Sequence, residues 1–409
     1  MTIRPDHSSS RALRVLWVTT KSPWPAHDGG RLLMDGTLRS LDPEHVRVSL
    51  VFPAQSSAAR GSERAPSESG ELARSGLPPC LDEVVEVPVP LPPRAPLSLT
   101  RPATAERHRF STMRGEVGRR LECARHDVIH VEQPHALENV PDTKTPILLR
   151  AQNVEQDLWY QMARAGKRPL RWALAAEARR VARWERAMLR RAQRVVAIST
   201  EDQERLGEIA GRDHPSIQVI RPALASSQTA GPALDGDPAL SLFAGSSWGP
   251  NRDGARHFLQ HAWPKIRAAR SGSRLHVFGG ESSHADQPGV EHHASPFVTE
   301  RAFGEGALVV VPVRAASGVR MKILDAWSRG LAVVMTQTGA IGLGSRGRDI
   351  LEPVDGLEYL HQAVLRLADP SAAAKQVQLG RQWMEAHTKP TRVGSAFLEV
   401  YRQLATRFG

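Results

Sequence analysis

The segment 317–334 (SGVRMKILDAWSRGLAVV) combines residue types that suit a nucleoside diphosphate. Apolar residues recur at helical spacing after Gly318, which predicts that a helix begins there. Unpaired backbone N–H groups and the positive end of the helix dipole attract phosphate at such a position. The dipole disfavours Arg320 and Lys322 in the first turn, so an anion in front of them explains both cations better than helix stability does. Asp325 lies further along, where a carboxylate can accept hydrogen bonds from ribose hydroxyls.

Simpler interpretations exist for the same residues. Arg320 and Lys322 could lie on a solvated helix face, and Asp325 could form only a local cap or ion pair. The run 331–335 that follows reads as a buried parallel strand, which favours phosphate contact for the two cations. We therefore assign Arg320 and Lys322 the catalytic role of stabilising a leaving diphosphate.

With these residues the segment resembles the retaining GT-B glycosyltransferases of glycosyltransferase family 4, in the branch whose donor motif runs Gly-x-Arg-x-Lys-Ile-Leu-Glu-Ala. Six residues match the motif: Gly318, Arg320, Lys322, Ile323, Leu324 and Ala326. Asp325 replaces the usual Glu, and Ser317 stands where the general family motif has another Glu. The resemblance implies that Ser317, Gly318 and Asp325 contact the donor.

A second segment, 242–251 (LFAGSSWGPN), is similar to the first strand and loop of the donor domain in this family. The resemblance implies donor-binding roles for Gly245, Trp248 and Asn251. Loop packing is the alternative for Trp248, and a helix N-cap is the alternative for Asn251.

A third segment, 148–155 (LLRAQNVE), is similar to a strand end in the acceptor domain, which implies acceptor-side roles for Asn153 and Glu155. Asn153 could instead cap a helix. Near the N-terminus, Gly29 and Gly30 follow a predicted strand and precede a helical pattern. They could merely form a tight turn, but in the family an equivalent glycine loop lets the backbone approach a phosphate.

Strands alternate with helical patterns along the chain, which predicts two doubly wound α/β domains facing each other across a cleft. The predicted strands are 13–20, 46–52, 127–131, 145–149, 194–198 and 217–220, then 239–244, 274–278, 307–313 and 332–336. We predict an acceptor-side domain at 1–222, a linker at 223–238 and a donor domain at 239–388. Residues 54–79 read as a loop. A C-terminal helix at 389–409 is expected to pack back on the first domain.

The charge of the chain is concentrated in one place. Its 409 residues carry a net charge of +11, of which residues 160–194 contribute +9. A single basic patch argues against a nucleic-acid partner, which we do not expect. On a helical wheel Arg179, Arg183, Arg186 and Arg190 form one stripe. The stripe is either a solvated helix face or a surface for anionic lipid headgroups or a phosphorylated acceptor. Lipid headgroups would bring residues 171–194 to a membrane.

Cysteine and histidine usage give no sign of a metal site. Cys80 and Cys123 form no CxxC pattern, and the 16 His residues lack metal-ligand spacing, with His292 and His293 in an expected loop. We therefore expect no cofactor and no metal. The N-terminus lacks a signal peptide and no apolar stretch could span a membrane, which predicts a cytoplasmic protein, at most peripheral to the inner face of the membrane.

These observations predict a bacterial glycosyltransferase that moves a hexosyl or related group from a nucleotide sugar to an unidentified acceptor. Retention of configuration is implied by the resemblance only. The acceptor could be a small molecule or lipid-linked, for an envelope or exopolysaccharide precursor or a secondary metabolite. A nucleotide-sugar epimerase of the same fold and a non-catalytic basic binding protein remain the alternatives.

Overall fold

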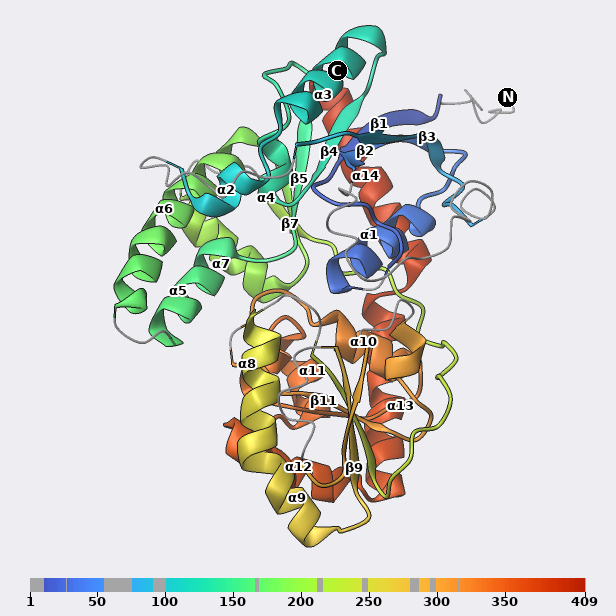
Figure 1. Cartoon of the computed structure of the whole chain (residues 1–409). Helices are drawn as coiled ribbons and strands as arrows, with labels where there is room; N and C mark the ends of the chain where they lie inside the picture. Colours follow the sequence, from blue (N-terminus) through green and yellow to red (C-terminus); the bar gives the residue numbers. More distant parts are fainter. Residues whose placement is uncertain are drawn as a thin grey trace, which may run out of the picture.

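The computed structural model describes residues 11–26, 28–54, 76–90, 101–165, 169–211, 216–244, 249–279, 287–294, 299–314 and 316–408. Within these residues the chain forms two parallel sheets, one above the other in Figure 1, each flanked by helices. The strand segments are rich in Val, Leu and Ile and are mostly buried, as in β11 (Leu308–Val311, LVVV). Such near-continuous apolar runs are typical of parallel strands that are covered on both faces.

The N-terminal sheet has the order β3-β2-β1-β4-β5-β6-β7. Its strands are β1 (Leu13–Val18), β2 (Val46–Pro53), β3 (Leu81–Val87), β4 (Val128–Glu132), β5 (Ile147–Ala151), β6 (Arg194–Ala197) and β7 (Ser216–Val219). The helices are α1 (Gly29–Ser40), α2 (Ala103–Arg107), α3 (Ser111–Cys123), α4 (Pro134–Leu137), α5 (Glu155–Ala165), α6 (Leu170–Arg191) and α7 (Thr200–Ala210). The chain leaves β1 and β4 toward opposite edges, so a crevice is expected at their carboxyl ends.

The C-terminal sheet has the order β10-β9-β8-β11-β12 and a second such switch point, between β8 and β11. Its other strands are β8 (Ala239–Phe243), β9 (Arg274–Phe278), β10 (Val290–His293) and β12 (Val333–Met335). One face packs against α8 (Gly249–His257), α9 (Trp263–Ala269) and α12 (Leu360–Leu367). The other packs against α10 (Met321–Ser328), α11 (Gly344–Leu351) and α13 (Pro370–His387). Figure 1 shows α8 and α13 on opposite sides of the strands.

The last helix, α14 (Pro390–Phe408), returns to the N-terminal domain, which also holds the first strand, β1 (Figure 1). Its apolar stripe, which includes Phe397 and Tyr401, is buried in the core beneath β1 and β4. Gly394 allows α14 to approach α1, because an added Cβ would lie 1.9 Å from the carbonyl oxygen of Ser40. The expected fold, two doubly wound sheets with a helix crossing back, is confirmed.

Two edge strands, β3 and β10, were not expected from the sequence. Both include charged or polar residues, LDEVVEV and VEHH, which suits an edge strand that keeps part of its surface in water. The expectation that His292 and His293 lie in a loop is wrong, since both belong to β10. Most of the loop expected at 54–79 lies outside the described residues, and the domain boundaries stay predictions.

None of the described helices combines the length and the apolar character that crossing a membrane requires.

Candidate active site

The segment that carries the two cations includes the end of the β11–α10 connection and the first two residues of α10, and it is called here the donor loop (317–322). Gly318 has a left-handed backbone, with φ at 71°, and α10 begins only at Met321 with Arg320 as its N-cap. The prediction that a helix begins at Gly318 is therefore wrong, because a left-handed residue cannot be part of a right-handed helix. Lys322 does lie in the first turn.

Lys322 lies at the switch point of the C-terminal sheet. Its Nζ donates a 2.6 Å hydrogen bond to the carbonyl oxygen of Phe243, the last residue of β8, and lies 4.9 Å from the centre of the Phe243 ring. Burial, with the charge of Arg320 added, lowers the pKa of Lys322 to about 7. Burial likewise lowers the pKa of Arg320 to about 10. Two neighbouring cations with lowered pKa values are a place where an anion would be stabilised.

The donor loop contacts the end of β5 in the other domain. An added Cβ on Gly318 would lie 2.3 Å from the carbonyl oxygen of Gln152, so only glycine fits. The buried Ser317 hydroxyl accepts a 2.6 Å hydrogen bond from the backbone N–H of Val154. With its amide nitrogen facing the two backbone oxygens, Asn153 donates to Ser317 and Gln152 at 3.1 Å each. The structure thus brings Ser317 and Gly318, predicted to contact the donor, together with Asn153, predicted to lie on the acceptor side.

Asp202, a residue not assigned from the sequence, also meets the donor loop. It is buried in the first turn of α7, and its Oδ1 accepts from the backbone N–H of Gly318 at 3.2 Å and from the Ser317 hydroxyl at 3.4 Å. Burial raises the pKa of Asp202, although hydrogen bonds and Arg320 act against that rise. The Asp202 carboxylate is therefore hydrogen-bonded to the backbone N–H of Gly318, which was expected to face phosphate. A sequence signal for Asp202 was present. Ser199 follows a predicted strand and is followed three residues later by an acid, a pattern typical of a helix N-cap.

Asp325 is buried on α10 and accepts a 2.7 Å hydrogen bond from Nε of Arg329, one helical turn away. This is the local ion pair that the sequence left open as the alternative. Ribose contact by Asp325 stays a prediction.

The segment after β8 carries three of the predicted donor contacts, Gly245, Trp248 and Asn251. Gly245 and Trp248 lie outside the described residues. Asn251 is half-buried and lies within α8, which begins at Gly249, so an N-cap role for it is wrong. Its contact with the donor stays a prediction.

Gly29 and Gly30 are the first two residues of α1, capped by Asp28, and not a loop that precedes the helix. An added Cβ on Gly29 would lie 3.3 Å from Cβ of Met321, the first residue of α10. At Gly30 it would lie 2.9 Å from Oε1 of Gln152. Figure 1 shows α1 directly above α10. Gly29 thus permits close approach between the domains, and Gly30 permits close approach between α1 and Gln152 within the N-terminal domain. Phosphate contact by the two glycines stays a prediction.

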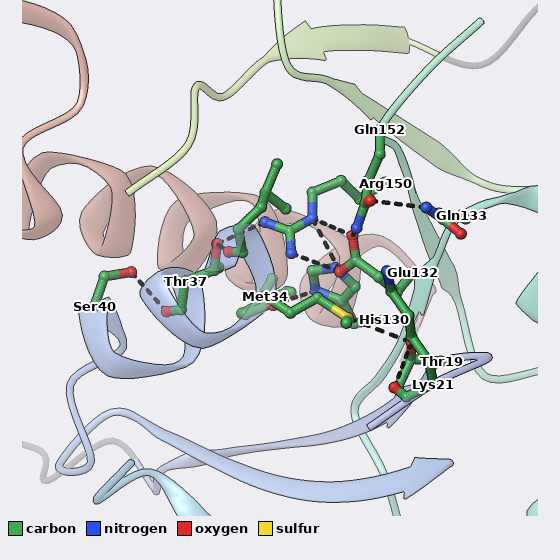
Figure 2. Close-up of polar contacts among 12 residues, drawn as sticks. Thr19, Lys21, Met34, Thr37, Ser40, His130, Glu132, Gln133, Arg150 and Gln152 are labelled. Carbon is green, nitrogen blue, oxygen red and sulfur yellow. Dashed lines mark hydrogen bonds and ion pairs between the residues drawn. The ribbon is translucent and has the colours of Figure 1, made fainter. Parts of the chain in front are cut away.

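A buried polar network lies at the carboxyl ends of β4 and β5, where the strand order predicts the N-terminal crevice (Figure 2). Arg150 on β5 binds the Glu132 carboxylate through Nε and Nη2 at 2.7 and 2.6 Å, and Nη1 donates to the Thr37 hydroxyl at 2.6 Å. Gln152 donates to Glu132 at 2.7 Å and accepts from Gln133 at 2.7 Å. Burial alone would raise the pKa of Glu132, but the Arg150 charge lowers it below its usual range. The charged pair is satisfied internally, and Gln152 links it to the donor loop, since its carbonyl oxygen lies against Gly318.

Glu155 is buried at the start of α5, with its carboxylate 4.0 Å from Nε2 of His135. Burial raises the pKa of Glu155 to about 7. Its backbone N–H and that of Gln156 donate to the Glu185 carboxylate of α6 at 2.8 and 3.0 Å. Glu155 therefore contacts the interior of its own domain, and an acceptor-side role for it stays a prediction.

A cavity of about 510 Å³ opens beside the carboxyl ends of β11 and β12. Its wall includes Arg314, which contacts Asp253 and His257 of α8 at 3.2 and 3.0 Å, and it also includes Thr336. A volume of this order suits a small ligand. The cation pair of the donor loop lies outside the residues that line this cavity.

Comparisons with known proteins agree with this architecture. Residues 239–370 match the family model described as glycosyl transferases group 1. Similar solved structures include sucrose-phosphate synthase from Thermosynechococcus elongatus, with 14% identity, a TM-score of 0.68, and coverage of 97% of this chain and 100% of that chain. HepE from Anabaena, in complex with UDP and glucose, is 12% identical over 96% of this chain and 100% of that chain, with a TM-score of 0.60. A glycosyltransferase from Rickettsia africae is 12% identical over 97% and 100%, with a TM-score of 0.60. No curated protein matches the chain.

The C-terminal sheet with its helices is thus a group 1 glycosyltransferase domain, and the whole chain has the GT-B fold. The predictions of the fold, of the family and of a glycosyltransferase as the enzyme class are confirmed.

Proposed function

We propose that this chain transfers a sugar from a nucleoside-diphosphate donor to an acceptor, with the diphosphate held by Arg320 and Lys322. The observation that carries the proposal is the place of these cations, at the switch point between β8 and β11 of a group 1 glycosyltransferase domain. Solved structures of the same fold support a nucleotide sugar as the donor, since HepE is described with UDP-glucose.

The mechanism follows from where charge develops. As the bond between sugar and diphosphate breaks, negative charge grows on the leaving group and positive charge grows on the sugar ring. Arg320 and Lys322 are held in place before the reaction, so they stabilise the developing negative charge more than the bound ground state. Retention of configuration belongs to this proposal through the family resemblance. The two side chains supply the positive charge without a metal ion.

The contact between the domains would protect the reaction from water. The donor loop packs directly on the end of β5 through Ser317 and Gly318. Water that reached the activated sugar would compete with the acceptor and turn transfer into hydrolysis. Acceptor binding is therefore placed by this proposal on the N-terminal side, where Gln152 links the polar network to the donor loop.

Helix α6 bears on the nature of the acceptor. Arg186 and Arg190 donate to the carbonyl oxygens of Ile209 and Ala210 at the end of α7, at 2.7 and 3.0 Å, so the four arginines are not one uniformly solvated stripe. Arg186 and Arg190 are nevertheless exposed, as are Arg179 and Arg183, and Trp172 on the same helix is 67% exposed. An exposed Trp with cations suits an anionic membrane interface. We include in the proposal a lipid-linked acceptor met at the cytoplasmic face of a membrane, with a small soluble acceptor as the alternative.

The experiment measures nucleotide binding by the rise in melting temperature when UDP, GDP or dTDP is present. At a ligand concentration 100 times the dissociation constant, stabilisation should reach about 2.7 kcal/mol. Arg320→Ala and Lys322→Ala should each remove most of this gain and lower turnover by roughly 10². Arg366→Ala, an exposed site on α12, is the matched control. If none of the three nucleotides shifts the melting temperature, or if all three variants respond like wild type, the proposal is wrong.

The epimerase alternative is separated by its product. An epimerase would convert the nucleotide sugar into its stereoisomer without any acceptor, and a transferase would release the free nucleotide.

A further inference from the structure

Three side chains with metal-ligating atoms meet at the edge of the C-terminal sheet. They are His276 on β9 and Glu291 and His293 on β10, and one ligand atom from each lies within 4.8 Å of the other two. β9 and β10 are parallel, with Glu291 opposite His276, so residues 276, 291 and 293 share one face of the sheet. His276 is buried, and the other two are half-buried, which leaves the group reachable from solvent.

The spacing of the ligand atoms suits a tetrahedral ion. Nδ1 of His276 lies 3.0 Å from Nε2 of His293 and 3.5 Å from Oε2 of Glu291. Ligands that bind Zn²⁺ at about 2.0–2.1 Å in tetrahedral geometry lie about 3.3 Å from each other. The two observed distances bracket that value.

The protonation of His276 is set by its surroundings. Its Nε2 lies 2.8 Å from the carbonyl oxygen of Asp235, which can only accept a hydrogen bond. Nε2 therefore carries the hydrogen, and Nδ1 presents a lone pair to the cluster. A histidine that ligates a metal commonly donates its other N–H to a backbone carbonyl, which orients the ring.

A hydrogen bond alone accounts for only part of the cluster. His293 can donate from Nε2 to the lone pair of His276, but Oε2 of Glu291 then faces the same lone pair at 3.5 Å, acceptor against acceptor. The other oxygen, Oε1, is bound by Arg274 at 3.3 Å. A cation between them would attract both Oε2 of Glu291 and the lone pair on Nδ1 of His276, and so would remove this repulsion.

The ring of His293 is already held in position. It stacks on Phe278, with ring centres 4.5 Å apart, and on His276, with centres 5.2 Å apart. Side chains that packing restrains lose little entropy when they bind an ion.

We propose that His276, Glu291 and His293 bind one divalent transition-metal ion of the Zn²⁺ class, with water in the fourth position. Two imidazoles and one carboxylate suit Zn²⁺, whereas Mg²⁺ and Ca²⁺ prefer oxygen ligands alone. The ion joins the short edge strand β10 to β9 and, through Asp235, to the segment that precedes β8. We assign the ion no part in the sugar transfer, because it lies at the β9–β10 edge of the sheet, whereas the cations of the donor loop lie at the switch point between β8 and β11.

The test uses full-length protein without a histidine tag, stripped with chelator, dialysed against Zn²⁺ and analysed for bound metal. We expect one Zn²⁺ per chain and a higher melting temperature with Zn²⁺ than with Mg²⁺. Glu291→Gln and His293→Gln should each weaken Zn²⁺ binding about tenfold or more. Nucleotide binding should change little in both variants, which separates this proposal from the one for the donor loop.

His292→Gln is the matched control, because His292 lies on the same strand with its side chain on the opposite face. It should bind Zn²⁺ like wild type. The proposal is overturned if wild-type protein retains no stoichiometric Zn²⁺. It is equally overturned if Glu291→Gln and His293→Gln retain the wild-type affinity.

Discussion

Lys322 offers a test by pH alone. In the free protein its pKa is about 7, because burial and Arg320 disfavour the charged form. A diphosphate beside it would favour the charged form and return the pKa toward the ordinary value of about 10.4. Binding above pH 7 then requires uptake of a proton by Lys322. Nucleotide affinity should therefore be highest at or below pH 7 and should fall as the pH rises.

The magnitude follows from the fraction of Lys322 that is already charged. At pH 8 about one Lys322 in ten is protonated in the free protein, and at pH 9 about one in a hundred. The dissociation constant for UDP should rise toward tenfold per pH unit, equivalent to about 1.4 kcal/mol, and by about 50-fold between pH 7 and 9, because about half of Lys322 is still charged at pH 7. The terminal phosphate, with a pKa near 6, keeps its charge across this range.

The assay is titration calorimetry with UDP at pH 7, 8 and 9, each in two buffers of different ionisation enthalpy. Proton uptake should rise from about one half at pH 7 toward about one at pH 9. Lys322→Arg is the matched control, since a guanidinium stays charged throughout and should remove both the uptake and the slope. A wild-type affinity that does not change between pH 7 and 9, or an equal slope in Lys322→Arg, would refute the assignment of Lys322 to the diphosphate.

Three further substitutions test other parts of the structure. Asp202→Asn keeps an acceptor for the donor loop but removes a carboxylate that competes with the diphosphate, so UDP should bind about tenfold more tightly by calorimetry; an unchanged affinity would contradict this. Arg150→Met leaves the buried Glu132 without its cation and should lower the free energy of unfolding by about 3–5 kcal/mol in urea denaturation, with a smaller loss when Glu132→Gln is added. Changing the exposed Arg179 and Arg183 to Gln together should weaken sedimentation with anionic liposomes at low salt, by about 1 kcal/mol for each residue. If the wild type ignores such liposomes, the lipid-linked acceptor is wrong.

The sequence by itself determined the fold class and the enzyme class of this protein. Buried parallel strands such as 308–311 are runs of apolar residues, so they can be predicted from the sequence. The donor motif around Arg320 and Lys322 is also local, and its neighbours within a few residues are enough to identify it. Edge strands such as β10 escaped because their composition is polar, and local pattern alone cannot distinguish a polar strand from a loop.

Only the tertiary structure decided which distant residues meet. Asp202 and Gly318 lie far apart in the chain, and their hydrogen bond exists because one domain packs on the other. His276 and His293 come together because β9 and β10 pair in parallel at one register, a relation that no spacing in the sequence encodes. The physical reason is that backbone preference acts over a few residues, whereas these contacts depend on how whole strands and domains bury their apolar faces.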